Sequence, residues 1–166
     1  MAVASPIRRD LAIGGWGLAG VGLIGVIAAS IVVGDAAGRV IIPFIIVALV
    51  FGLAQVIVSG GWLRNAVADA PPPPQDLVME AESTTLRRVG LPAVLIAILV
   101  IIALFSWVQF AALLAGVAFA AGSTDLRSRY WITAFEREHG VTILREVAWL
   151  SFATVRKPLW ARPDGD

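Results

Sequence analysis

The sequence predicts an all-α integral membrane protein with four transmembrane helices, arranged as two antiparallel hairpins (2+2), and a C-terminal cytoplasmic or interfacial amphipathic segment. The first observation is composition: of 166 residues, 58% are apolar and only 15% are charged, whereas soluble domains carry about 25% charged residues. The second is distribution. All 25 charged side chains, 13 basic and 12 acidic, lie outside three stretches, residues 11–33, 40–63 and 89–122, and each stretch is long enough to be a membrane-span candidate.

The first predicted hairpin covers residues 1–64, with spans over residues 11–33 and 40–63. Each span has more than 20 residues, which at about 1.5 Å per residue crosses a hydrocarbon core of about 30 Å with some tilt. Two glycines and an aspartate between the spans indicate a short turn. The first span is also longer than the apolar core of a signal peptide, about 7–15 residues, so we expect an anchor that is not cleaved.

Residues 65–83 form a predicted cytoplasmic loop that contains four consecutive prolines, residues 71–74. Such a run adopts the polyproline II conformation and acts as a stiff spacer. A docking motif for a proline-reading domain is the alternative. For residues 75–82 we expect a short surface helix.

The second predicted hairpin covers residues 84–123, with spans over residues 86–105 and 107–123. One helix over the 34 uncharged residues of this stretch would be about 51 Å long, too long for a single crossing. Ser106 to Gln109 would form the outer turn. At the start of the hairpin, Thr84 or Thr85 would cap the third helix, with Arg87 and Arg88 extending toward the membrane surface.

Charge distribution separates three spans from four. With four spans, 12 of the 13 Lys and Arg residues lie on one side and only Arg39 on the other, whereas three spans divide them 5 to 8. The positive-inside rule favours the 12-to-1 arrangement, with both termini in the cytoplasm. A re-entrant hairpin over residues 89–122 is the alternative, and it leaves the tail on the same side.

Residues 124–166 form the predicted cytoplasmic or interfacial tail. Ser123 or Thr124 would cap an amphipathic helix beside the membrane, which ends near His139 and is closed by Gly140. Residues 141–155 match neither a helical nor a strand period. Aromatic and basic side chains of the tail are candidates for interfacial contacts; these are Trp131, Trp149, Trp160, Arg145, Arg156 and Lys157.

Small residues form ridges on the first and fourth predicted helices, and such ridges let two helix backbones approach closely. The ridges predict packing within the bundle or, alternatively, docking to another subunit. Their residues are Gly14, Gly15, Gly22, Gly25 and Ala29 on the first helix, and Ala112 and Gly116 on the fourth.

Few residues in the predicted spans have side chains that could bind a ligand or react. Gln55 is a strong polar group inside a span, where it would bond a neighbouring helix or contact a solute. Proton relays, ion-coupled transport and voltage sensing need charged or histidine side chains within the membrane, and the three stretches hold none. With no cysteine and His139 as the only histidine, the sequence predicts no metal site and no cofactor.

The sequence therefore predicts a non-catalytic membrane protein, an accessory, assembly or scaffolding subunit of a larger complex. Its partners would be the lipid bilayer and other membrane subunits or a second copy, and a net charge of +1 gives no reason to expect nucleic acid. The alternatives are a small homo-oligomeric transporter or channel for a neutral or apolar solute, and a lipid-binding membrane protein. We expect a multi-pass protein of the bacterial plasma (inner) membrane.

Overall fold

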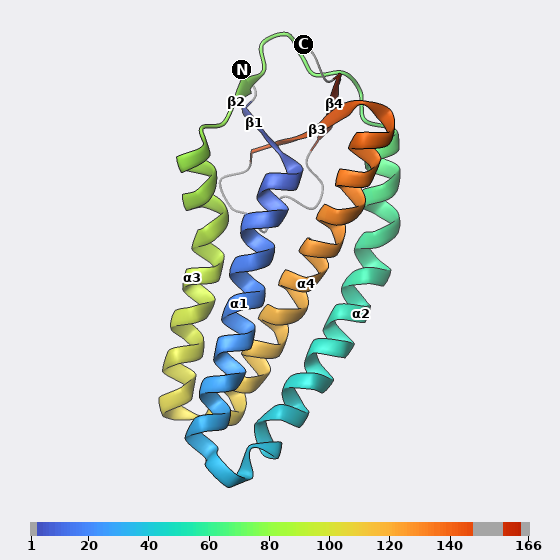
Figure 1. The fold of residues 1–166 in the computed structure, drawn as a ribbon. Helices are drawn as coiled ribbons and strands as arrows, with labels where there is room; N and C mark the ends of the chain where they lie inside the picture. Colours follow the sequence, from blue (N-terminus) through green and yellow to red (C-terminus); the bar gives the residue numbers. More distant parts are fainter. Residues whose placement is uncertain (1–2, 148–157, 164–166) are drawn as a thin grey trace.

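The computed structural model describes residues 3–147 and 158–163. In this part of the chain, four long helices run side by side and a small sheet covers one end of the bundle, where both ends of the chain also lie (Figure 1). All four helices are long and apolar enough to cross a membrane. The prediction of a mostly helical chain with four helices long and apolar enough to span a membrane is confirmed.

The first two long helices are joined by a tight turn. Helix α1 (Ile7–Val33) leads into a short 3-10 helix, η1 (Gly34–Ala36), and α2 (Gly38–Ala68) follows. Gly34 has φ +59° and its N–H donates to the carbonyl of Ser30. A glycine adopts this backbone conformation without the steric cost that a side chain brings, so the predicted short turn is observed.

The other two long helices are separated by a single residue. Helix α3 (Glu82–Ser106) ends at Trp107, which has extended backbone angles, and α4 (Val108–His139) begins directly after it. The N–H of Trp107 donates to the carbonyl of Ala103 at 2.7 Å, and its own carbonyl accepts from Ala111 at 3.2 Å. Residues 89–122 thus belong to two full-length helices, of 25 and 32 residues, which is the length that two crossings require.

The end of α4 differs from the expected separate tail helix. Neither Ser123 nor Thr124 caps a helix, because α4 runs unbroken through both, and the Thr124 hydroxyl donates to the carbonyl of Ala120 at 2.9 Å instead. This helix-internal bond competes with capping. The predicted stop is confirmed: Gly140 follows α4 with φ +61° in the left-handed region.

The helices pack mainly through α4. Helix α1 lies against α4 and α3, α2 lies against α4, and α1 and α2 have little contact with each other. The small-residue ridges provide these close approaches. A Cβ atom added to Gly22 would lie 2.6 Å from the carbonyl oxygen of Ala115, and one added to Gly116 would lie 2.9 Å from that of Phe44.

The sheet has the strand order β2-β1-β3-β4. Strand β1 (Val3–Pro6) pairs in parallel with β2 (Val78–Met79) and antiparallel with β3 (Val141–Glu146), and β3 pairs antiparallel with β4 (Leu159–Pro163). A hydrophobic cluster fills the space between the sheet and the helix ends, and its buried members are Ile7, Val67, Ile132, Ile143 and Leu159.

This sheet corrects two expectations about the segments outside the bundle. Residues 75–82 do not form a surface helix: Val78 and Met79 form β2, and α3 begins at Glu82. The last part of α4 is not a separate helix but the continuation of the long one, and its Ile132 is buried against the sheet. Both differences arise from pairing with residues distant in sequence, which a local pattern does not encode.

The prolines lie beside the sheet. The carbonyl of Pro71 accepts a hydrogen bond from the N–H of Ala161 in β4 at 2.9 Å. The segment that was expected to act as a spacer therefore contacts the strand at that edge of the sheet.

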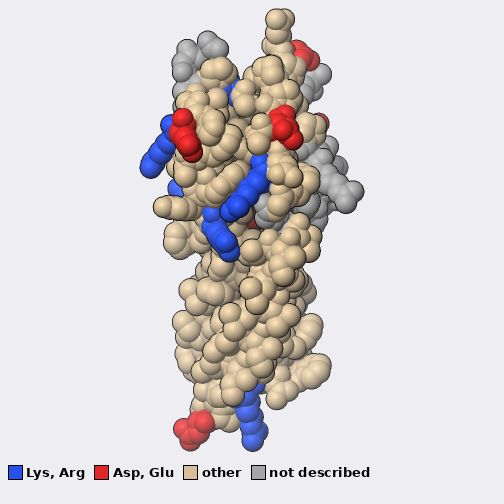
Figure 2. All heavy atoms as spheres, turned by 90° about the vertical axis from the view of Figure 1, so that its right-hand side faces the viewer, with Lys and Arg blue, Asp and Glu red and all other residues tan. Residues whose placement is uncertain are grey.

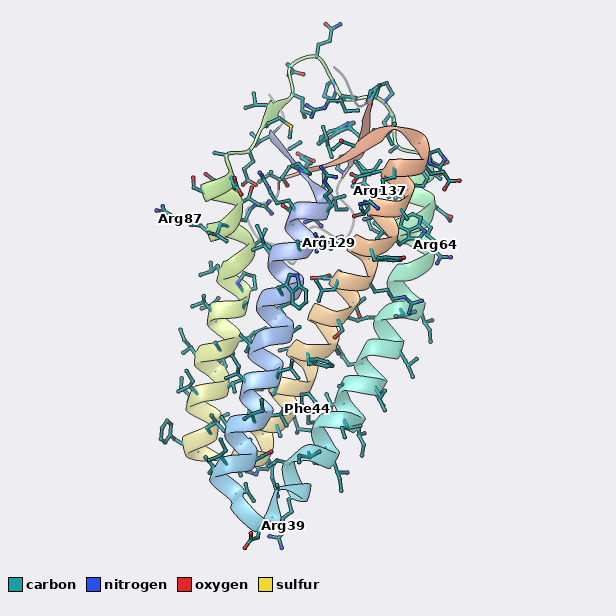
Figure 3. All side chains as sticks on the ribbon, in the orientation of Figure 1. Arg39, Phe44, Arg64, Arg87, Arg129 and Arg137 are labelled. Atoms are coloured by element: carbon teal, nitrogen blue, oxygen red, sulfur yellow. The ribbon has the colours of Figure 1, made fainter. Side chains whose placement is uncertain are left out.

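Charged side chains divide the molecule along its length. Figure 2 shows a long band without charged residues between charged groups at both ends. In Figure 3, Arg39 lies at the end opposite the sheet, whereas Arg64, Arg87, Arg129 and Arg137 lie toward the sheet-covered end. The band corresponds to the three uncharged stretches of the sequence.

Candidate functional site

A buried network of charged side chains lies where the sheet meets α1 and α3. The Nη2 atom of Arg88 donates to Asp10 Oδ2 at 3.0 Å, and Arg145 Nη2 donates to the same oxygen at 2.9 Å. The side chains of Asp10, Arg88 and Arg145 are only 1%, 6% and 13% exposed. The Ser5 hydroxyl also donates to Asp10 Oδ2, at 2.9 Å.

Glu80 completes the network from the loop before α3. Arg88 donates to it from two nitrogens, Nε to Oε1 at 3.1 Å and Nη2 to Oε2 at 2.9 Å. The Thr85 hydroxyl donates to Glu80 Oε2 at 2.6 Å and accepts from Arg9. Burial alone would raise the pKa of Glu80, but hydrogen bonds from Arg88 and Thr85 and the charges of Arg88 and Arg9 outweigh it and lower that pKa below its ordinary value.

This network ties five segments of the chain together. Its ion pairs and bidentate contacts join β1, α1, the loop at Glu80, α3 and β3. The acids are engaged by guanidinium groups, which hold carboxylates in the ionised form. Among the described residues, no group of three or more His, Cys, Asp or Glu side chains is placed to hold a metal ion.

A pocket of about 430 Å³ lies next to the network, between α1, α2 and α4. Most of its lining is apolar and includes Leu11 of α1, Val58 and Trp62 of α2, and Leu159 of β4. The polar side chains of the lining come mainly from α4 and β3, and these are Thr124, Asp125, Ser128 and Arg145, while Gln55 lies on α2 with Val58 and Trp62. The size and the mixed lining match those of small-molecule sites, which are commonly about 300–1,000 Å³.

Asp125 is the distinctive group in this pocket. Its carboxylate lies against the backbone of α1, where a Cβ atom added to Gly14 would be 3.5 Å from Asp125 Oδ2. Arg145 also lines the pocket, but its Nη2 atom donates to Asp10. Within residues 3–147 and 158–163, Asp125 makes no hydrogen bond or ion pair, so its oxygens are available as acceptors.

The pocket spans the boundary of the uncharged band. Val58 is 78% exposed and Trp62 37% exposed, and both belong to the uncharged stretch 40–63. Asp125 and Arg145 lie beyond the end of such stretches in the sequence. One side of the pocket is therefore apolar, exposed and within an uncharged stretch, while the other side is polar.

The structure places the predicted small residues inside the bundle. All seven are buried, on the faces of α1 and α4 that meet neighbouring helices. Gly14, Gly15, Gly22 and Gly25 face α3 or α4, and Gly116 faces α2. Gln55, the predicted polar contact in the membrane, lines the pocket.

The predicted interfacial residues of the tail separate into three groups. Arg145 is in the buried network, which corrects its expected surface role, because Asp10 pairs with it. Trp131 lies under Arg64, whose Cζ is 5.7 Å from the ring centroid, and Trp160 is partly buried in β4. Trp149, Arg156 and Lys157 lie outside the described residues.

Two residues near helix ends also differ in role from expectation. Arg88 does not extend toward the membrane surface, because Asp10 and Glu80 hold it inside. Thr85 does not cap α3, whose preceding residue is Ala81, and bonds Glu80 instead.

His139 stacks on Phe135, with ring centroids 4.0 Å apart, and its Nδ1 lies 3.0 Å from the Phe135 carbonyl.

Sequence reasoning did not select Asp10, Glu80 or Asp125. Each is a single acidic residue beside an uncharged stretch, which resembles an ordinary flanking charge. The position of Asp125 is a signal that could have pointed to it. Asp125 follows Gly122, the last residue of an uncharged stretch, by three residues on a helix that continues to His139, so its carboxylate lies close to the end of the predicted span.

Comparison with known proteins gives no relative. A scan against protein-family models, a search of curated proteins and a search of solved structures found no match.

Proposed function

We propose that this protein is a non-catalytic membrane protein that binds a lipid or another amphiphile in the pocket between α1, α2 and α4. The observation that carries the proposal is the division of the pocket lining. Leu11, Val58 and Trp62 of α1 and α2 offer an apolar surface, and Asp125 offers a polar group from α4, with the hydroxyls of Thr124 and Ser128. An amphiphile presents a chain to the first and a head group to the second.

The exposed residues of the pocket support entry from the bilayer. Val58 and Trp62 lie at the open side and in an uncharged stretch of α2. An alkyl chain that moves from the bilayer into the pocket would pass these residues and stay in an apolar environment. The transfer would therefore cost little of the free energy that is gained by keeping the chain out of water.

We also propose the orientation of the bundle. The helices cross the plasma membrane as two hairpins, with both termini and the sheet in the cytoplasm. Among the described Lys and Arg residues, only Arg39 lies at the end opposite the sheet, and cytoplasmic segments carry the excess of these residues. The arginine-rich composition supports a bacterial inner membrane.

The accessory-subunit hypothesis stays a prediction with less support. The small-residue ridges, which suggested docking to another subunit, contact helices of the same chain. A transporter of neutral solutes also stays a prediction, and Gln55 in the pocket lining is the residue it would use.

Binding of a 12-carbon alcohol tests the proposed function. We expect tritiated dodecanol to bind the purified full-length protein saturably in a non-ionic detergent. Ala54→Trp adds an indole ring to the pocket lining and should weaken binding at least about 10-fold, the effect of losing about 1.4 kcal/mol. The matched control Leu53→Trp adds the same ring at a neighbouring exposed position and should bind like the wild type. Absence of saturable binding, or equal binding by both variants, would contradict the proposal.

Single cysteines test the orientation, since the chain has no native cysteine. Cysteine at Asp35 or Gln109 should react with a membrane-impermeant maleimide added outside intact cells. Cysteine at Asp69 should react only after the membrane is opened. The reverse pattern would contradict the orientation and leave the binding proposal intact.

A further inference from the structure

The pocket holds a carboxylate without a partner among the described residues. Asp125 is partly buried and makes no hydrogen bond or ion pair there. Burying an ionised carboxylate without a partner is costly. A ligand that brings a positive charge and N–H donors to this position would remove that cost, whereas a phosphate or carboxylate head group would meet repulsion.

The other polar groups of the pocket suit the same head group. Thr124 and Ser128 contribute hydroxyl groups to the lining, and a hydroxyl oxygen can accept a hydrogen bond. Among the described residues of the lining, the cation is Arg145, whose Nη2 atom donates to Asp10 and whose charge also acts on Asp125 without forming an ion pair with it.

We propose that the head group bound at this polar side is a primary amine, protonated to an ammonium that donates hydrogen bonds to Asp125. The inference rests on the proposed binding function and specifies its ligand class: a primary-amine amphiphile. Ammonium-to-carboxylate hydrogen bonds are stronger than those of neutral donors. An alcohol brings a single neutral donor to the same acceptor, so it should bind more weakly than the amine with an equal chain.

The ligand could be a free alkylamine or an ethanolamine lipid, and both present the same ammonium group. The alkyl chain of either would lie along Leu11, Val58 and Trp62. The two sources differ in the phosphodiester of the lipid, which adds a negative charge next to the amine. An experiment with both forms separates them.

The test compares tritiated dodecylamine with tritiated dodecanol on the full-length protein in a non-ionic detergent at pH 7. We expect dodecylamine to bind about 10-fold more tightly or better, because hydrogen bonds between an ammonium and a carboxylate are stronger than those from a neutral hydroxyl. Asp125→Asn, which keeps the shape and removes the charge, should abolish this preference, because its amide oxygen can still accept from dodecanol but no longer pairs with an ammonium charge. Asp35→Asn, at the exposed turn opposite the sheet, is the matched control and should keep the preference.

Competition identifies the source of the amine. Displacement of dodecylamine by nanodiscs of phosphatidylethanolamine would assign the site to a lipid head group, and resistance to them would assign it to a free amine. Stronger displacement by phosphatidylglycerol, which has no amine, would overturn the inference.

The outcomes separate the inference from the proposed function. If both probes bind equally and Asp125→Asn changes neither, the amine assignment fails while amphiphile binding stands. If neither probe binds the wild type saturably, the proposed function itself fails.

Discussion

Arg88 and Asp10 are separated by 78 positions in the sequence and form a buried ion pair, with 3.0 Å between Nη2 and Oδ2. The contact joins the first turn of α1 to α3. Because Arg145 of β3 shares the same oxygen of Asp10, the pair also ties the sheet to the bundle. The position of Arg145 at the edge of the pocket therefore depends on Asp10.

Removing the charge of Asp10 should destabilise the sheet-covered end. In Asp10→Asn, Arg88 and Arg145 lose a shared partner while buried, and breaking a buried pair by removing one member costs about 3–5 kcal/mol. The free energy of unfolding can be measured by titrating the protein from mild detergent into SDS. The matched variant Asp35→Asn lies at an exposed position and should stay within about 0.5 kcal/mol of the wild type. Equal stability of the two variants would show that the network contributes little.

Glu80 should make the protein sensitive to acid. Its pKa is lowered below the ordinary 4.5, so its contribution to stability is fully present above pH 4.5 and is lost as the pH falls through the lower, folded-state value. Thermal unfolding in detergent should show a steeper loss of stability in this range for the wild type than for Glu80→Gln. Glu82→Gln, at an exposed position two residues later, should keep the wild-type slope. Parallel slopes for the wild type and Glu80→Gln would contradict the assignment.

Two glycines of α1 should differ sharply in their tolerance of a methyl group. The Cβ of Gly22→Ala would lie 2.6 Å from the carbonyl oxygen of Ala115 in α4, whereas that of Gly20→Ala meets nothing within 4 Å. Overpacking costs about 1–3 kcal/mol, and Gly20→Ala should be neutral or stabilising by up to about 1 kcal/mol. The same SDS titration measures both. Equal effects would mean that α1 and α4 are not in close contact at Gly22.

The helical part of the fold could be predicted because its signals are local. Uncharged stretches locate the four helices, and Gly34 and Gly140 mark turns that need special backbone conformations. The small-residue faces could also be located, although their partners could not. Gly22 meets α4 and Gly116 meets α2, and a helical wheel does not say which neighbour a face meets.

The sheet and the network could not be predicted because they depend on distant pairing. Ser5 lies opposite Arg145 in the register of β1 and β3, and Val78 pairs with Val3. Nothing near residues 75–82 indicates that a strand of only two residues will form there. The sequence predicted Arg88 to extend to the membrane surface for the same reason. Its partners Asp10 and Glu80 lie outside α3, in α1 and in the loop after β2.

The sequence did not predict the pocket, although it selected two residues of the lining, Gln55 as a polar contact in the membrane and Arg145 as an interfacial residue. Gln55 stood out as an amide in an apolar helix, but its setting depends on Asp125 of α4 and Arg145 of β3. Bringing the three together requires both the helix packing and the sheet.

Photolabelling tests the central claim, amphiphile binding in the pocket, most directly. A dodecanol derivative with a diazirine on its chain is irradiated with the full-length protein, and the labelled peptides are identified by mass spectrometry. We expect labelling to concentrate in residues 54–63 and 124–128 and to disappear with excess unlabelled dodecylamine. Labelling spread over the outward faces of α2 and α3, with no loss on competition, would contradict the claim.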